Sequence, residues 1–122
     1  NFAIMSWKFY LLALLGGGIG SSIRFAASRY IPFDTQTFAW GTFLVNALGC
    51  FFIGWLWIKL NSPMEKSFWI AGIMGGLTTF SGLGLETFRY LNDKSYGLAL
   101  QYVIFSIILG ILLVWLGQRI AS

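Results

Sequence analysis

Residues 72–86 read GIMGGLTTFSGLGLE. The stretch carries no charge before Glu86, yet its paired glycines followed by two threonines are poor helix-forming sequence. We therefore predict an apolar helix that is broken near residues 75–81. Within a membrane, such a break is tolerated only where it is buried in protein or lines a wet cavity. The break is either a packing kink or part of a functional path, in which freed carbonyls face a cation or freed N–H groups face an anion.

The composition of the whole chain places this stretch in a membrane. Of the 122 residues, 57% are hydrophobic and only 10% are charged, and the mean hydropathy is +0.75. A soluble domain carries about 25% charged residues, so these values exclude a soluble enzyme. The net charge of +4 is spread along the chain, which gives no indication of a nucleic-acid partner.

Charged residues divide the chain into four apolar segments, one for each expected transmembrane helix. The approximate spans are 8–30, 37–59, 67–90 and 96–118. Each is close to the roughly 20 residues that cross the hydrocarbon core of a bilayer, and the short connections make neighbouring helices antiparallel. We predict an all-α membrane protein that forms one transmembrane domain over residues 1–122, with its third helix broken at mid-span.

Lysine and arginine residues are balanced between the two sides of this predicted bundle. They are Lys8, Lys59, Lys66 and Arg119 on one side, and Arg29, Arg89, Lys94 and, if it reaches that surface, Arg24 on the other. A fixed orientation needs an excess of positive charge on one side. The balance favours a chain that inserts in both orientations and forms an antiparallel, dual-topology dimer.

Few polar residues lie within the predicted spans. Asn46 follows Thr42 by one helical turn, so this amide and hydroxyl share a face and either hold helices together or line a pore. Arg24 either extends to the surface or supplies positive potential at the mouth of an anion path. Tyr102 and Ser106 share a face of the fourth span, although Tyr102 also fits an aromatic residue at the membrane interface.

The residue types also restrict the chemistry. The chain has no histidine and one cysteine, Cys50, and Glu86 is the only acidic residue near a span. General acid–base catalysis and metal-assisted hydrolysis therefore lack their residues, so we expect no enzyme. Neutral N–H and O–H donors with one arginine suit a small dehydrated anion. Gly16 and Gly20 form a GxxxG pair, which is typical of close helix packing.

These residues resemble the Fluc/CrcB family of fluoride channels. The resemblance rests on residues 16–20 with Arg24, on residues 41–46, and on residues 75–81 with Glu86. It implies an antiparallel homodimer in the lipid bilayer of a bacterial inner membrane. Such a dimer has two pores, exports cytoplasmic fluoride passively and relieves its toxicity.

The resemblance also implies roles for single residues. Asn46 would donate its amide to fluoride, and the ring edge of Phe80, the positive part of its quadrupole, would face the ion. Arg24 would attract anions at a vestibule, and backbone carbonyls of Gly75 and Thr78 would hold a structural Na⁺ at the dimer centre. The residues expected along the fluoride pathway are Asn46, Phe80, Ser81, Thr42, Tyr102 and Ser106.

Two positions depart from the family pattern. Leu83 stands where a second phenylalanine is usual, and Gly110 stands where a hydroxyl is often found. A leucine has no polarised ring edge, so the chain either conducts with Phe80 alone, conducts slowly, or pairs with a different subunit. Tyr102 and Ser106 remain as the polar candidates of the fourth span.

Two other functions are compatible with a short four-span chain. The first is a small proton-coupled transporter of the multidrug type, which binds cations through a membrane-embedded glutamate in its first span. This chain has Arg24 in that span and no acid. The second is a non-conducting subunit of a larger membrane complex, against which the broken third span and Asn46 argue only weakly.

Overall fold

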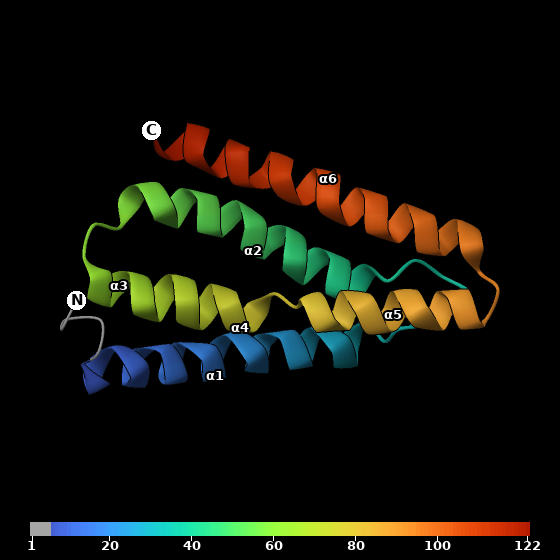
Figure 1. The fold of residues 1–122 in the computed structure, drawn as a ribbon, viewed down its shortest axis with the longest axis horizontal. Coiled ribbons are helices and arrows are strands. Elements are labelled where there is room, and N and C mark those ends of the chain that lie inside the picture. Colours follow the sequence, from blue (N-terminus) through green and yellow to red (C-terminus); the bar gives the residue numbers. More distant parts are fainter. Residues whose placement is uncertain (1–5) are drawn as a thin grey trace.

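Four helical segments run in alternating directions along the length of the protein (Figure 1). The computed structural model describes residues 6–122, so residues 1–5 of the expected domain lie outside the described residues. The segments are α1 (Trp7–Tyr30), α2 (Trp40–Lys59), a third segment over Pro63–Asn92, and α6 (Tyr96–Ala121). Each is long and apolar enough to cross a membrane. The predicted all-helical fold with four membrane spans is confirmed.

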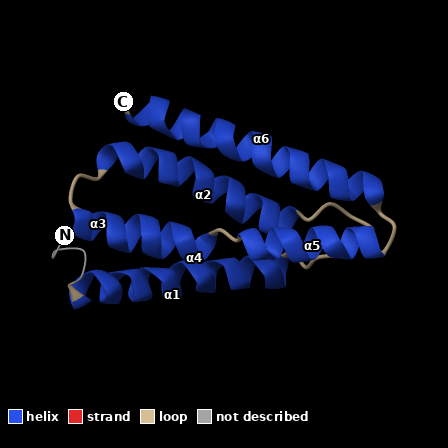
Figure 2. Ribbon diagram, in the orientation of Figure 1, coloured by secondary structure: helices blue, strands red, loops and turns tan. Residues whose placement is uncertain are grey.

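The third segment is interrupted at Thr78 and Thr79, as Figure 2 shows by the loop between α4 and α5. Both threonines are extended, with φ and ψ of −90° and 152° at Thr78 and −145° and 119° at Thr79. The predicted break in the third helix is therefore confirmed. The parts of this segment are α3 (Pro63–Lys66), the π-helix η2 (Ser67–Met74), α4 (Gly75–Leu77) and α5 (Phe80–Asn92).

The third segment begins at Pro63, earlier than the expected start at residue 67. The Ser62 side chain accepts a hydrogen bond from the Met64 N–H, and the Glu65 carboxylate accepts one from the Ser62 N–H. This capping box, with proline at the first helical position, is a strong start signal for a helix. Ser62 and Pro63 therefore start the helix.

The second helix begins at Trp40, later than the expected start at residue 37, because the preceding loop is fixed against other elements. The Tyr90 hydroxyl donates to the Thr37 carbonyl at 2.6 Å, and the Ser95 hydroxyl donates to the Thr35 carbonyl at 3.0 Å. These bonds hold the loop between α1 and α2 against the end of α5.

Glycines let α1 pack closely against η2 and α4. A side-chain carbon on Gly16 would overlap the carbonyl oxygen of Phe68, and one on Gly20 would overlap that of Ile73. Small residues allow this backbone approach in membrane proteins. The packing role predicted for the GxxxG pair is confirmed.

Glycines also line the contact between α2 and α6. A side-chain carbon on Gly54 would overlap the carbonyl oxygen of Val114, and one on Gly117 would overlap that of Phe51. The bundle therefore consists of two close helix pairs, α1 with η2 and α4, and α2 with α6.

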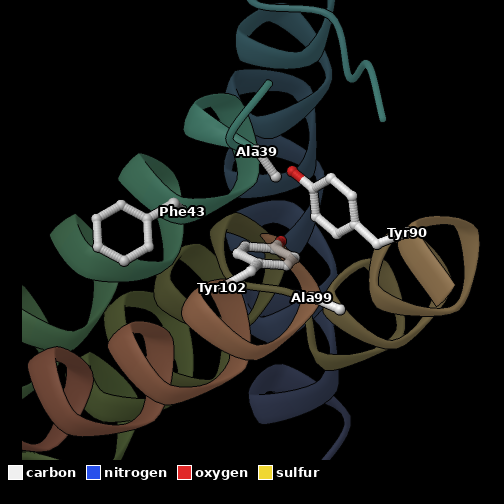
Figure 3. Close-up of a cluster of buried hydrophobic side chains, with 5 residues drawn as sticks. All are labelled: Ala39, Phe43, Tyr90, Ala99 and Tyr102. Carbon is white, nitrogen blue, oxygen red and sulfur yellow. The ribbon is translucent and has the colours of Figure 1, made fainter. Parts of the chain in front are cut away.

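A buried aromatic cluster joins α5 to the pair of α2 and α6 (Figure 3). Tyr90 and Tyr102 are fully buried and meet edge to face, with ring centroids 5.9 Å apart. The members of the cluster are Ala39, Phe43, Tyr90, Ala99 and Tyr102. In contrast, large apolar side chains such as Leu14 and Ile111 are 70% and 67% exposed on the outer surface, which suits contact with lipid.

We predict that Gly20→Ala destabilises the protein by about 1–3 kcal/mol, because the added methyl group overlaps the η2 backbone. Thermal unfolding in detergent, followed by loss of the folded elution peak, measures the effect. Gly18→Ala is the matched control, since a side-chain carbon there meets nothing within 4 Å. Equal unfolding temperatures for the two variants would contradict this packing account.

Candidate functional site

Asn46 on α2 holds the break in the third segment through two reciprocal hydrogen bonds. Its side-chain carbonyl accepts from the Thr79 N–H at 2.7 Å, and its amide donates to the Thr79 carbonyl at 3.2 Å. The Asn46 side chain thus provides the hydrogen-bond acceptor and the donor that Thr79 lacks because the helix is interrupted. Asn46 therefore connects helices, and one of its two N–H donors remains available after the bond to Thr79.

The break redirects backbone groups that a continuous helix would pair. In such a helix the N–H of Thr79 would donate to Gly75, and that of Gly82 would donate to Thr78. Here Thr79 donates to Asn46, and Gly82 donates to the Thr79 hydroxyl at 2.8 Å. The carbonyls of Gly75 and Thr78 have therefore lost their helical donors.

Arg24 is bonded to the same break. Its Nε donates to the Gly76 carbonyl at 2.9 Å, and the residue is partly buried. Arg24 is therefore a neighbour of the break, and its guanidinium does not simply extend to the surface from α1. Its predicted role in attracting anions stays a prediction.

Two pockets flank the break, and Thr79 lines both. The first, which we call the phenylalanine pocket, has a volume of about 360 Å³ and is lined by Asn46, Thr78, Thr79, Phe80, Leu83 and Ser106, among others. The second, the arginine pocket, has a volume of about 210 Å³, and its lining includes Arg24, Ser28, Thr42, Thr79, Glu86 and Arg89. Since both reach Thr79, the break lies between a mainly apolar pocket and a pocket that contains charged side chains.

Ser106 brings an unpartnered hydroxyl to the phenylalanine pocket. Among the non-exposed residues of the described chain, its Oγ is the one buried side-chain polar atom without a hydrogen-bond partner. Buried polar groups in native proteins are nearly always paired. Ser106 is therefore a buried polar group beside the pocket whose hydrogen-bonding capacity the protein itself does not use.

The start of α5 also faces this region. Phe80 is its first residue and is 85% exposed, and the Ser81 hydroxyl lies 3.3 Å from the Thr79 hydroxyl. The first N–H groups of a helix have no partner inside the helix and carry partial positive charge. The break therefore places a positive helix end next to Asn46 and the phenylalanine pocket.

Tyr102 lies inside the protein rather than at a lipid-facing position. It is fully buried, and its hydroxyl donates to the Glu86 carboxylate at 2.7 Å. This excludes the alternative of an interfacial aromatic for Tyr102. Glu86 and Thr42 line the arginine pocket, whereas Tyr102 supports that pocket through Glu86.

The two departures from the family pattern have structural counterparts. Leu83 lines the phenylalanine pocket and also packs against the buried aromatic cluster. A side-chain carbon on Gly110 would lie only 3.2 Å from the Cys50 sulfur. The Cys50 thiol therefore leaves little room for a side chain at position 110.

The structure thus divides the predicted site residues into groups. Asn46, Phe80 and Ser106 line one pocket, and Arg24 and Thr42 line the other. Sequence reasoning missed Thr79 and Arg89 as site residues. The only signal for Thr79 was its place in the poor helix-forming stretch, and Arg89 was counted only as a charge near a membrane surface.

Four membrane-spanning helices around a polar break define a multi-pass membrane protein. The family model described as CrcB-like protein, Camphor Resistance (CrcB), matches residues 11–118. The chain belongs to this CrcB family. It is 40% identical over 119 residues to a Thermus thermophilus protein named Fluoride-specific ion channel FluC, covering 93% of both chains.

Two further bacterial relatives carry the same name. The Helicobacter pylori protein is 39% identical over 120 residues, which cover 93% of this chain and 92% of the relative. The Oceanobacillus iheyensis protein is 36% identical over 116 residues, which cover 91% of this chain and 89% of the relative. The similarity therefore extends over almost the whole chain.

We predict that Asn46→Leu lowers stability by about 1–3 kcal/mol, because it leaves the Thr79 N–H and carbonyl unpaired inside the bundle. Thermal unfolding of the purified protein measures the loss. Asn46→Asp serves as the comparison, since its carboxylate still accepts from the Thr79 N–H. A Leu variant as stable as the wild type would show that the two hydrogen bonds do not hold the break.

Proposed function

We propose that this chain is a fluoride-specific channel that lets fluoride cross the membrane passively. The proposal is supported by its membership of the CrcB family and by the name that its relatives share. The observation that carries it is the break at Thr78 and Thr79, which sets hydrogen-bond donors and a positive helix end within a membrane span. A channel makes and breaks no covalent bond, so the chain is not an enzyme.

Fluoride holds its water molecules tightly, so a pore has to offer donors in their place, much as carbonyls replace the water around a cation. In this proposal the remaining N–H of Asn46 and the hydroxyls of Ser106, Ser81 and Thr42 supply them. The Asn46 side chain is preorganised, because Thr79 accepts one amide N–H and donates to the amide oxygen. Tyr102 contributes by orienting Glu86 beside the arginine pocket.

The ring of Phe80 is the one aromatic group that we propose to face the ion. An aromatic edge is the positive part of the ring quadrupole and attracts an anion. Leu83 lies in the same pocket and packs against the buried aromatic cluster. Leu83 fills apolar space there, so the proposed channel works without a second phenylalanine.

The proposed channel is an antiparallel homodimer. Phe80 is 85% exposed beside a pocket within a membrane span, and a second copy would cover this ring and close the pocket. The balanced Lys and Arg counts on the two sides support insertion in both orientations. In a bacterial inner membrane, such a dimer would export cytoplasmic fluoride and relieve its toxicity.

We also propose a structural Na⁺ at the dimer centre. The carbonyls of Gly75 and Thr78 have lost their helical donors to the break, and carbonyl oxygen is a ligand that hard cations accept. The residues present therefore fit the ion. When bound, it would balance the partial negative charge of these carbonyls.

The multidrug-type transporter finds little support. α1 contains no acidic residue. Glu86, on α5, accepts a hydrogen bond from the buried Tyr102 of α6. A cation site would need a carboxylate that is free for its substrate.

We expect liposomes that contain the purified protein to release fluoride rapidly and to retain chloride, because the proposed pore dehydrates only the smaller anion. Ion-selective electrodes measure both ions in parallel, with protein-free liposomes as the control. Asn46→Asp should abolish fluoride release while the protein stays folded, since it adds a negative charge to the pathway. Equal release of chloride, or no release of either ion, would contradict the proposed function.

We predict that Ser106→Ala slows fluoride release without lowering stability. The hydroxyl has no partner inside the protein, so its removal costs no hydrogen bond and relieves an unsatisfied buried group. Fluoride flux and thermal unfolding are measured on the same preparation. Unchanged flux in this variant would remove Ser106 from the pathway.

A further inference from the structure

The arginine pocket contains two arginines, and their surroundings differ. Arg24 comes from α1 and Arg89 from the last turn of α5, and both line the pocket together with Ser28 and Thr42. A pocket of about 210 Å³ with two cations and one carboxylate, Glu86, carries net positive charge. The question is which arginine attracts an anion into it.

Arg24 bonds to the backbone through one of its five N–H donors. Its Nε donates to the Gly76 carbonyl, and the residue is partly buried. Gly76 lost its own helical donor, because the N–H of Phe80 lies beyond the break. Removal of Arg24 would leave this carbonyl unpaired within the membrane span.

Arg89 is exposed and held by an aromatic face. Its guanidinium carbon lies 4.7 Å from the centroid of the Phe33 ring. Phe33 is itself packed edge to face on buried Tyr90, with centroids 5.0 Å apart. Stacking on a ring fixes the guanidinium but leaves its N–H groups at the rim free to donate.

The nearby carboxylate does not neutralise Arg89 through a direct bond. Glu86 lies one turn earlier on the same helix, yet the hydrogen bond it accepts comes from the Tyr102 hydroxyl. The phenol therefore orients the carboxylate, and the guanidinium keeps donors for a ligand.

We propose that Arg89 is the anion-attracting charge of the arginine pocket, fixed there by Phe33, and that Arg24 is a positioning residue that holds the helix break. The inference rests on the proposed function only for the identity of the anion as fluoride. A simpler role for Arg89 is to interact with the C-terminal dipole of α5. That role predicts an effect on stability and none on anions in the pocket.

Charged thiol reagents test the potential inside the pocket without relying on conduction. Cys50 is the only cysteine, so a Cys50→Ala background removes competing thiols. Ser28→Cys then places one thiol in the arginine pocket. Its modification rates with a negatively charged and a positively charged methanethiosulfonate give a ratio that reports the local potential.

We predict that Arg89→Gln lowers the ratio of anionic to cationic modification about fivefold, because one charge roughly 8 Å away in water changes the two rates slightly more than twofold each, in opposite directions. Arg89→Lys, which keeps the charge, should restore most of the ratio. The matched control is Lys94→Asn, which removes one positive charge just beyond α5 and outside the pocket. Lys94 has a φ of 60°, which asparagine tolerates.

Arg24→Gln should lower the unfolding temperature more than Arg89→Gln does, because Gly76 loses its donor. The proposal is overturned if Arg89→Gln leaves the ratio unchanged, or if Arg24→Gln lowers the ratio as much as Arg89→Gln does or more. Fluoride flux of the same variants separates the role of Arg89 in the pocket from the proposed function as a fluoride channel. If Arg89→Gln lowers the modification ratio but the protein conducts no fluoride, the role of Arg89 in the pocket stands and the proposed fluoride channel is rejected.

Discussion

The reciprocal pairing of Asn46 with Thr79 is the constraint on which the rest of the structure depends. It allows two residues of extended backbone to remain inside a membrane span. Hydrocarbon offers no water to unpaired N–H and C=O groups, and each such group costs several kcal/mol there. A single amide side chain supplies a donor and an acceptor together, so one residue on α2 can satisfy both groups of Thr79.

Close helix packing brings the other partners of the break into reach. Gly16 and Gly20 let α1 lie directly on the backbone of η2 and α4. Arg24 follows Gly20 by one turn, and this position lets its Nε bond to Gly76. The glycine pair and the arginine therefore act together: the glycines set the distance between the two backbones, and the arginine satisfies a carbonyl that the break exposes.

The break also separates charge along the third segment. Carbonyls that lost their helical donors lie at the end of α4, and the first N–H groups of α5, which have no partner inside the helix, lie across the break from them. One location thus offers oxygen ligands to a cation and donors to an anion. The two pockets meet at Thr79, between these helix ends, so the same irregular backbone that needs protection by Asn46 is available to an ion.

The sequence by itself determined the four spans and the break, because apolar length and poor helix-forming residues are local properties. It also identified Asn46, Ser106 and Arg24, since polar groups are rare in membrane spans. It left open whether Asn46 joins helices or faces a pore, and it missed Thr79 and Arg89. Only the tertiary structure decided that Asn46 bonds to the break, that Tyr102 is buried against Glu86, and that Arg89 meets Arg24 in one pocket. These contacts join residues far apart in the chain, and helix packing, not local pattern, brings them together.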